Sequence, residues 1–417
     1  MTSSTIPRRR IPDETAGLLR DGYLFGIRRF DRMHTDAFQT RLALRSVVVM
    51  RGRDAARFFS EGGRFTRAAA MPASATHLLQ DAGSVQQLEG EAHAARKHEF
   101  IELLGVSART ALVETFAREW ERAFARPRMD GRPVVLQRLF SDILARSAAT
   151  WCGIPDVDSV AAQDGRRFAE MIEGAGRVGP PNWAARTRRH GVERRAAELV
   201  DEVRTGRRPA DDASALARIS ALRDSNGAEL PREVAAVELL NLIRPIVAVG
   251  RFLVFAALAL RRRPDWAERF RDGQGDSTEL RAFVDEVRRF YPFFPMIAGR
   301  ASTGLAWHGH RFVPGDTVAL DLYATDHDER LWPDAERFLP ERFQNDPAGR
   351  NSLVAQGGGD YAEGHRCPGE PATVELMAEG IRRLVGLRYR LPDQDLRVSL
   401  RRMPAGPASG LVIELKR

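Results

Sequence analysis

The 417-residue chain has few cysteines and no long apolar run. Cys152 and Cys367 are its two cysteines. So few thiols are typical of a reduced compartment, where a cysteine is more often a ligand or nucleophile than half of a disulfide. The longest purely apolar run, residues 252–260, is too short to cross a bilayer, and the first twenty residues lack the apolar stretch of a signal peptide. We therefore expect a cytoplasmic protein without stable membrane insertion.

Lysine is almost absent as well, and the charge pattern argues against nucleic-acid binding. The formal net charge is +8, yet of 64 basic residues only Lys97 and Lys416 are lysine. The arginines are spread from end to end, and their longest runs, 8–10 and 261–263, carry no interleaved aromatic residues. A nucleic-acid surface usually concentrates its charge on one face or stripe. We expect no nucleic-acid partner.

Helical patterns dominate what is present. Apolar spacing after Pro231 predicts one long helix over about 231–260. A second helix is expected over about 279–291, because Asp276 and Glu279 have the spacing of a capping box just ahead of it.

Strand signals are fewer and shorter. Apolar segments broken by Gly, Pro and Asp over 297–320 and 386–415 predict a few small strands. The chain shows no internal repeat and no long linker. We therefore predict a mainly α protein in which residues 1–417 form a single domain.

The segment that most strongly suggests chemistry is GGGDYAEGHRCPGE, residues 357–370. Its glycines allow the backbone to approach a flat partner closely. Cys367 comes just before a helical pattern, and amides at a helix N-terminus lower the pKa of a thiol toward thiolate. A thiolate ligand pushes electron density onto haem iron. The alternative is a buried, inert cysteine in a Gly-rich turn.

Two further motifs precede this loop. Glu286 and Arg289 form an E-x-x-R pair one helical turn apart, and Arg342 lies in FLPERF. The order of the three motifs resembles the cytochrome P-450 superfamily. The resemblance implies the cytochrome P-450 fold, a large helical domain with a small β-rich region. It also implies haem b with Cys367 as the axial ligand to iron, and a structural Glu–Arg–Arg set behind the cysteine loop.

The form of the cysteine loop resembles one branch of that superfamily. Most members place Phe seven residues before the cysteine, where this chain has Asp360, and a triple glycine lies upstream at 357–359. Cys367 and Gly369 keep their usual places, as does His365 at the basic position two before the cysteine, which makes His365 a cofactor-binding candidate. The pattern is similar to bacterial fatty-acid peroxygenases, which consume hydrogen peroxide directly. The resemblance implies hydrogen peroxide as co-substrate and no required redox partner.

The long helix carries Arg244 and Pro245 where ordinary members have an acid–alcohol pair. No Asp/Glu–Thr pair occurs between Val234 and Arg251. Pro245 removes a backbone donor, which predicts a kink. Arg244 has apolar sequence neighbours, and a guanidinium among apolar groups needs an anion. The commoner fate of such an arginine is to extend to solvent or to pair with an internal carboxylate.

The resemblance suggests a fatty-acid carboxylate as that anion. A bidentate, charge-assisted pair with Arg244 is worth about 1.5–3 kcal/mol for its hydrogen bonds. The same carboxylate would serve as the general acid–base that the protein lacks. Since the head group would then lie near the haem, we expect hydroxylation of long-chain fatty acids at the α and/or β carbon.

Three further positions are assigned by the resemblance. Aligned on EGEAH, Gln86 falls where hydroxylating members have Gln and alkene-forming members have His, so Gln86 favours hydroxylation. The branch often has Phe where this chain has Gln80, which alters the expected pocket shape. Lys97 and Arg67 stand where the superfamily commonly meets a haem propionate. The alternative for Gln86, Lys97 and Arg67 is an ordinary polar or ion-paired surface residue.

Three alternatives to a peroxide-dependent hydroxylase stay open. The first is a fatty-acid decarboxylase that gives terminal alkenes, which Gln86 disfavours. The second is a reductase-dependent cytochrome P-450 monooxygenase, which the missing acid–alcohol pair disfavours. The third is a non-catalytic haem-binding protein. His308 and His310 lack a nearby third ligand and are expected to be structural, and Cys152 is expected in the core.

Overall fold

The computed structural model describes residues 6–79, 83–125, 132–154, 157 and 164–416. Helices make up most of it, which confirms the predicted class. The α-helices are α1 (Thr15–Asp21), α2 (Leu24–Met33), α3 (Arg53–Ser60), α4 (Ala73–Leu79), α5 (Gly90–Leu103), α6 (Val106–Phe124), α7 (Leu136–Trp151), α9 (Arg166–Ala175), α10 (Pro180–Arg204), α11 (Ala215–Ser220), α12 (Arg232–Arg262), α13 (Pro264–Arg271), α14 (Ser277–Phe290), α15 (Leu322–Asp326), α16 (Glu341–Asn345) and α17 (Glu370–Gly386).

Short strands form the minor part of the fold. They are β1 (Ala37–Leu42), β2 (Arg45–Met50), β3 (Phe65–Thr66), β4 (Pro133–Val135), β5 (Met296–Ala301), β6 (Leu305–Trp307), β7 (His310–Phe312), β8 (Thr317–Asp321), β9 (Tyr389–Arg390) and β10 (Val412–Leu415). The strands expected over 297–320 and 386–415 are confirmed by β5–β8 and by β9 and β10.

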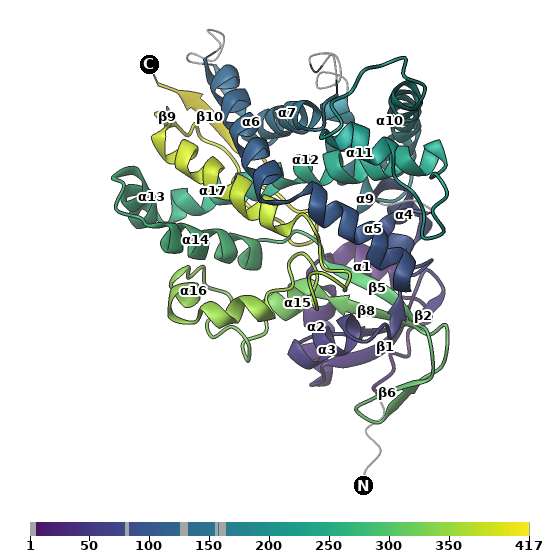
Figure 1. The fold of residues 1–417 in the computed structure, drawn as a ribbon. Helices are drawn as coiled ribbons and strands as arrows, with labels where there is room; N and C mark the ends of the chain where they lie inside the picture. The colour runs from purple at the N-terminus through teal and green to yellow at the C-terminus, as the bar shows by residue number, and fades with distance from the viewer. Residues whose placement is uncertain (1–5, 80–82, 126–131, 155–156, 158–163, 417) are drawn as a thin grey trace.

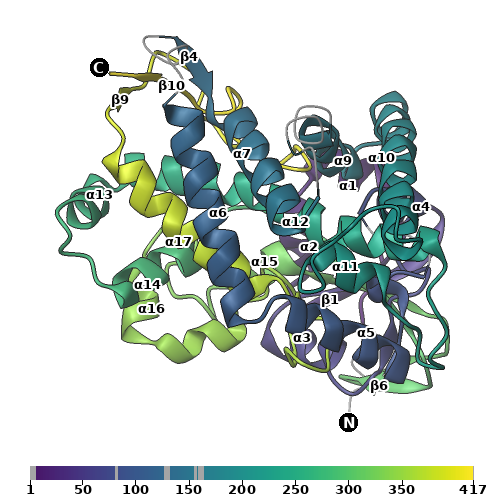
Figure 2. The same cartoon turned by 45° about the horizontal axis from the view of Figure 1, so that its top comes forward.

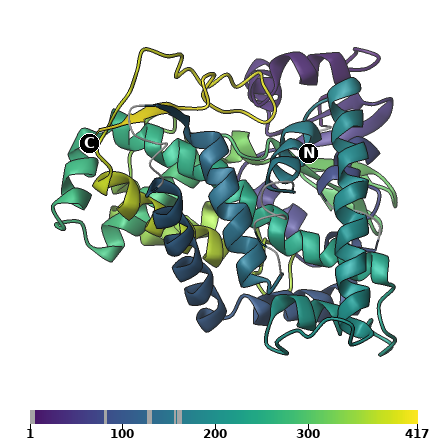
Figure 3. The same cartoon turned by 90° about the horizontal axis from the view of Figure 1, so that it is seen from above.

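The largest sheet has the order β1-β2-β8-β5-β3. Its one parallel pair joins β2 to β8, with Val48 opposite Val318, and its other pairs are antiparallel. In Figures 1 and 3 the N-terminal segments, in purple, gather with the green strands β5 and β8 on one side of the molecule. A second sheet, β4-β10-β9, and the hairpin β6-β7 complete the β structure among the described residues.

The long helix α12 is the centre of the helical part. It packs against α7, α10 and α17, and α17 also contacts α6, as Figures 1 and 2 show. By length and composition α12 is apolar enough to cross a membrane, but 83% of its most apolar window is buried inside the protein. It therefore serves as a core helix, and the predicted range of about 231–260 is confirmed at Arg232–Arg262.

The E-x-x-R helix begins as the sequence predicts. The Asp276 side chain accepts a hydrogen bond from the Glu279 backbone N–H at 2.7 Å, which caps α14. Later in α14, both Glu286 oxygens accept from Arg289, at 2.7 and 2.8 Å, and Arg342 Nε lies 3.2 Å from Glu286 Oε2. The predicted Glu–Arg–Arg set is confirmed.

Candidate active site

The cysteine loop lies between the 347–352 turn and α17, and its backbone geometry requires glycine. Gly357 and Gly359 have φ of 91° and 85°, in the left-handed region that favours glycine. At Gly364 a Cβ would lie 2.7 Å from the Asp360 carbonyl oxygen. The Cys367 backbone N–H donates to the Gln356 carbonyl at 3.1 Å, so the cysteine is held against the residue that directly precedes the loop.

Charged side chains tie this loop to α14. Arg288 is buried; it donates to Gln356 Oε1 at 3.1 Å and pairs with Asp285 at 2.8 Å and with Glu370. Arg366 pairs with the same Glu370 at 2.6 Å. Burial of the Glu370 carboxyl opposes its ionisation, but the hydrogen bonds and charges of Arg366 and Arg288 lower its pKa to about 2. The position of Cys367 is therefore fixed by a network that is charged at neutral pH.

The thiol of Cys367 differs from the sequence-based expectation. Burial raises its pKa, and the Gly369 backbone hydrogen bond and the charge of Lys97 lower it by less. The predicted net lowering by the helix N-terminus is therefore wrong for the protein alone, since desolvation outweighs the amides. A metal ion overrides this balance, because a coordinating thiol is deprotonated outright.

Three basic side chains gather beside the cysteine loop, and a fourth, Arg67, lies over the Phe59 ring and acts on His93 through its charge. Lys97 and His93 come from α5, Arg67 follows β3, and His365 belongs to the loop. Lys97 is 1% exposed and donates to the carbonyl oxygens of Arg366, at 2.9 Å, and of Gly364. The His365 ring lies 4.1 Å from the His93 ring.

Glu89 is the carboxylate that contacts this basic group. His365 Nε2 is 3.1 Å from Glu89 Oε2, and the backbone N–H of Arg67, not its guanidinium, donates to Glu89 Oε1 at 2.5 Å. Burial lowers the pKa of Lys97 to about 8 and that of Arg67 to about 10. Burial, with the charges of His365 and Lys97, lowers the pKa of His93 to about 4. Since charge in this group is costly without anions, anionic groups of a ligand would be stabilised here.

These features fit a haem. The loop glycines leave room for close approach of a flat group, Cys367 can offer sulfur to iron, and the basic group matches two propionates. The metal-ligating alternative at His308 and His310 gains no support: among residues 6–79, 83–125, 132–154, 157 and 164–416, no group of three His, Cys, Asp or Glu could hold a metal ion. Cys152 is in the core, as predicted.

Helix α12 is buried along most of its length but exposed at Pro245. Between Ala235 and Leu260 every residue is buried except Pro245, Ala248 and Arg251. Pro245 is exposed, whereas Ala248 and Arg251 are half-buried. The helix continues through Pro245, and the kink expected there stays a prediction.

Arg244 precedes this accessible position and is 4% exposed. Its Nη2 donates to Asn241 Oδ1 at 2.7 Å and to the Leu79 carbonyl, and both of these acceptors are neutral. Arg244 does not extend to solvent, so that alternative is wrong here.

The sequence-based reasoning missed a buried carboxylate close to Arg244. Glu238 is 0% exposed and pairs with Arg96 at 2.7 Å. Its Oε2 accepts from Asn241 Nδ2 at 2.9 Å, and the same Nδ2 donates to Gln86 Oε1 at 3.2 Å. Gln86 and Arg244 are thus joined through Asn241. One feature of the sequence could have identified this carboxylate: Glu238 is the only acidic residue in the largely apolar segment 234–260.

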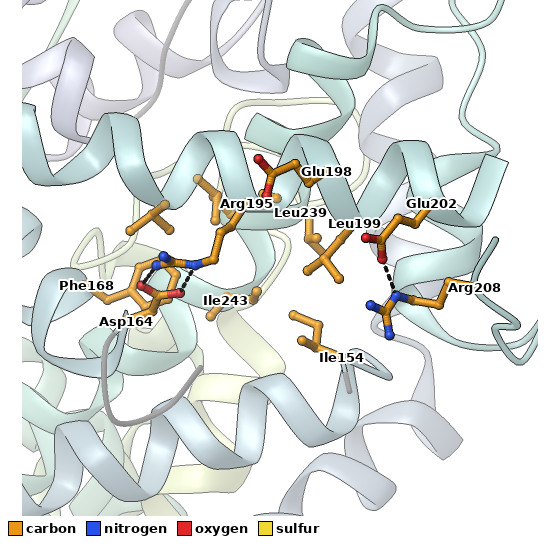
Figure 4. A pocket seen from close by; sticks show the side chains of 13 residues that line it. Ile154, Asp164, Phe168, Arg195, Glu198, Leu199, Glu202, Arg208, Leu239 and Ile243 are labelled. Atoms are coloured by element: carbon orange, nitrogen blue, oxygen red, sulfur yellow. Dashed lines mark hydrogen bonds and ion pairs between the residues drawn. The ribbon is translucent and has the colours of Figure 1, made fainter. Parts of the chain in front are cut away.

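A separate cavity of about 230 Å³ lies where α10 faces α12 (Figure 4). Apolar side chains such as Phe168, Leu239 and Ile243 line it, and Asp164–Arg195 and Glu202–Arg208 pairs stand at its sides. Among the described residues, neither Cys367 nor Arg244 lines it. It is therefore distinct from the candidate site.

Known proteins are similar to this chain in sequence and in fold. The family model described as cytochrome P450 matches residues 278–369, which include the E-x-x-R pair and Cys367. A solved structure of cytochrome P-450EX alpha (CYP152N1) with myristic acid is 35% identical; the alignment covers 99% of this chain and 98% of that chain, with a TM-score of 0.92. This chain belongs to the cytochrome P-450 family.

Two further relatives of this cytochrome P-450 are informative. A variant of cytochrome P-450 OleT in complex with arachidonic acid is 29% identical, covers 99% of this chain and 98% of that chain, and has a TM-score of 0.93. The curated cytochrome P-450 monooxygenase helB2 of Aspergillus fumigatus is 34% identical over 121 residues, 28% of this chain and 23% of that protein. The chain thus matches about a quarter of that curated relative's length.

The resemblance seen in the motifs is confirmed, in its superfamily and in its fatty-acid peroxygenase branch. The cytochrome P-450 fold is confirmed over the described residues, and the chain is a haem-dependent oxidoreductase of the cysteine-thiolate type. The site candidates fall into two groups: Lys97, Arg67, His365 and Cys367 around the loop, and Arg244, Pro245 and Gln86 around α12. Gln80 lies outside the described residues.

Proposed function

We propose that this cytochrome P-450 is a peroxygenase that hydroxylates long-chain fatty acids at the α and/or β carbon with hydrogen peroxide. The observation that carries the proposal is Arg244, a buried guanidinium on α12 that directly precedes the exposed Pro245. An anionic head group is what this position stabilises best. That solved relatives hold myristic and arachidonic acid supports a fatty acid as the ligand.

Cys367, as the thiolate, and the basic group of Arg67, Lys97 and His365 would hold haem b. With a thiolate ligand, haem supplies the chemistry of O–O bond cleavage and oxygen transfer. The overall reaction balances: one C–H bond becomes C–OH, and the second oxygen of hydrogen peroxide leaves as water. No redox partner is then needed, because hydrogen peroxide brings both the oxygen atom and the oxidising equivalents.

The residues of α12 bind and orient the substrate. Arg244 would form a bidentate pair with the carboxylate, which places the α and β carbons nearest the cysteine side of the site. A bound carboxylate is itself a proton acceptor and donor, so it can move a proton at the peroxide without a side-chain acid. Pro245 lacks a backbone N–H, so the Asn241 carbonyl receives no helical hydrogen bond from this position.

Gln86 supports hydroxylation over decarboxylation. Its carbonyl accepts from Asn241, so it is fixed close to Arg244. A neutral amide cannot take up a proton as an imidazole can, so it provides no additional base at the head group. The alkene-forming reaction is the second candidate, since the carboxylate would occupy the same position in both reactions.

Product analysis tests the proposal. The haem-loaded protein is given myristic acid and hydrogen peroxide without a reductase, and methyl myristate is run in parallel. We expect 2- and/or 3-hydroxy acid from the free acid and at least tenfold less product from the ester. No product from either substrate, or equal product from both, would contradict the proposal. Product that appears only with a reductase and NADPH would favour an ordinary monooxygenase.

A further inference from the structure

We propose that Glu238 is a positioning residue for substrate binding: acting through the Asn241 amide, it fixes how Arg244 and Gln86 present their donors to the substrate carboxylate. The inference rests on the proposed function, because it assumes that Arg244 binds that carboxylate.

The three α12 residues form a continuous chain of contacts. Glu238, Asn241 and Arg244 follow one another at intervals of three, so they share one helix face. Asn241 Nδ2 lies 2.9 Å from Glu238 Oε2, and Arg244 Nη2 lies 2.7 Å from Asn241 Oδ1. Their exposures are 0%, 6% and 4%, so water competes little with these contacts.

The hydrogen-bonding capacities of Glu238 and Arg244 decide the orientation of the Asn241 amide between them. Burial raises the pKa of Glu238, but its pair with Arg96 favours the carboxylate, which only accepts hydrogen bonds, whereas a guanidinium only donates them. Asn241 must therefore turn its NH2 to Glu238 and its carbonyl to Arg244. The reversed amide would set an oxygen against the carboxylate and an NH2 against the guanidinium. The charge of Glu238 thus determines which face of Asn241 holds Arg244.

Other donors hold Glu238 itself. Its Oε1 accepts from Arg96 Nη1 at 2.7 Å and from the Val85 N–H at 2.8 Å. Arg96 balances the charge of Glu238, and the neutral Asn241 stands between Glu238 and Arg244. Arg244 therefore contacts the neutral amide of Asn241 and not the Glu238 carboxylate itself.

The contacts that run from Glu238 through Asn241 to Arg244 and Gln86 form a relay. The same relay sets the orientation of the Gln86 side-chain amide. Asn241 Nδ2 donates to Gln86 Oε1 at 3.2 Å, which uses the Gln86 carbonyl. The Gln86 NH2 is then the half of the amide left for a ligand. Arg244 and Gln86 both become donors, and a carboxylate accepts from both. A methyl ester, which is uncharged, gains less from them.

Two variants and one control test the relay. Glu238→Gln keeps the shape but replaces one acceptor by a donor, so one of its contacts must break or Asn241 must turn. Asn241→Ala removes the relay and leaves the Arg96–Glu238 pair, which protects the fold. Glu233→Gln is the matched control: it lies on the same helix, and its carboxylate is exposed and pairs with exposed Arg232. Thermal melting of each haem-loaded variant verifies folding.

The readout is the dissociation constant of myristic acid and of methyl myristate, followed by haem absorbance of the holoprotein. We expect the constant for the acid to rise at least tenfold in Glu238→Gln and Asn241→Ala, and that for the ester to change less than twofold. Glu233→Gln leaves both within twofold. If Glu238 and Asn241 acted only on stability, their replacement would raise the dissociation constants of the acid and the ester equally. That result would overturn the proposal.

The outcomes separate the relay from the proposed function. If the wild type prefers the acid and both variants keep the wild-type ratio within twofold, the relay is wrong and the proposed function stands. If the wild type shows no preference for the acid, both are overturned. If Glu238→Gln does not fold, Asn241→Ala decides alone.

Discussion

Replacing Glu286 by Gln is expected to destabilise the protein more than any exposed Glu→Gln change. Glu286 is 0% exposed and accepts two hydrogen bonds from Arg289, at 2.7 and 2.8 Å, and one from the Leu339 N–H at 2.8 Å. Arg342 Nε lies 3.2 Å from its second oxygen. The amide of Gln keeps the shape but removes the charge and sets an NH2 against a guanidinium.

The expected loss of folding free energy follows from the guanidinium groups of Arg289 and Arg342, which lose their anionic partner. Arg289 is 1% exposed, and breaking a buried ion pair by removing one partner costs about 3–5 kcal/mol. Gln retains one acceptor, so we expect a loss near the lower end, about 3 kcal/mol. That is a large fraction of the roughly 5–15 kcal/mol that stabilises a typical native protein.

Urea unfolding followed by circular dichroism, at constant haem saturation, measures the effect. Glu233→Gln is the control, and we expect it to stay within about 0.5 kcal/mol of the wild type because its ion pair is exposed. A change of less than about 1 kcal/mol for Glu286→Gln would show that the charge of Glu286 is not what holds Arg289 and Arg342.

Four further outcomes are expected. Arg244→Leu should lower kcat/KM for myristic acid by about a hundredfold, with partial recovery in Arg244→Lys; unchanged turnover would refute the carboxylate pair. Gln86→His should raise the alkene share of the products, measured by gas chromatography; an unchanged share would refute the role of the amide. Burial raises the pKa of Asp326 to about 8, partly opposed by the Val354 N–H, so the native state keeps a proton that the unfolded state releases near its ordinary pKa of 3.8. The free energy of unfolding should therefore fall as pH rises from about 4 to 8, by up to about 1.4 kcal/mol per unit, and urea titrations of Asp326→Asn should show a smaller slope. Burial also raises the pKa of Cys152, so this thiol should resist iodoacetamide in the folded protein and react after unfolding; labelling of the native protein would contradict its place in the core.

The sequence predicted the helices whose signals are local. The α12 and α14 ranges follow from apolar spacing and from the Asp276 cap, both of which act within one helix. The strands β1 and β2 were not predicted, although β2 contains a run of valines. β2 pairs with β8, some 270 residues later, and the sequence alone does not reveal such a distant partner.

The site shows the same division. The cysteine loop and the Glu–Arg–Arg set could be predicted because their spacing is fixed along the chain. The relay of Glu238, Asn241 and Gln86 could not, because Gln86 reaches α12 only through the folding of a distant segment. The pKa of Cys367 was predicted with the wrong sign, because the sequence shows the helix that follows but not the burial that outweighs it.

The most direct test of the central claim is an experimental structure of the haem-loaded protein with myristic acid. We expect both carboxylate oxygens to lie within hydrogen-bonding distance, about 2.7–3.2 Å, of the Arg244 guanidinium, with the alkyl chain leading away from the cysteine side. A carboxylate bound near the surface, with the methyl end of the chain toward Cys367, would contradict the account and would place oxidation at the far end of the fatty acid.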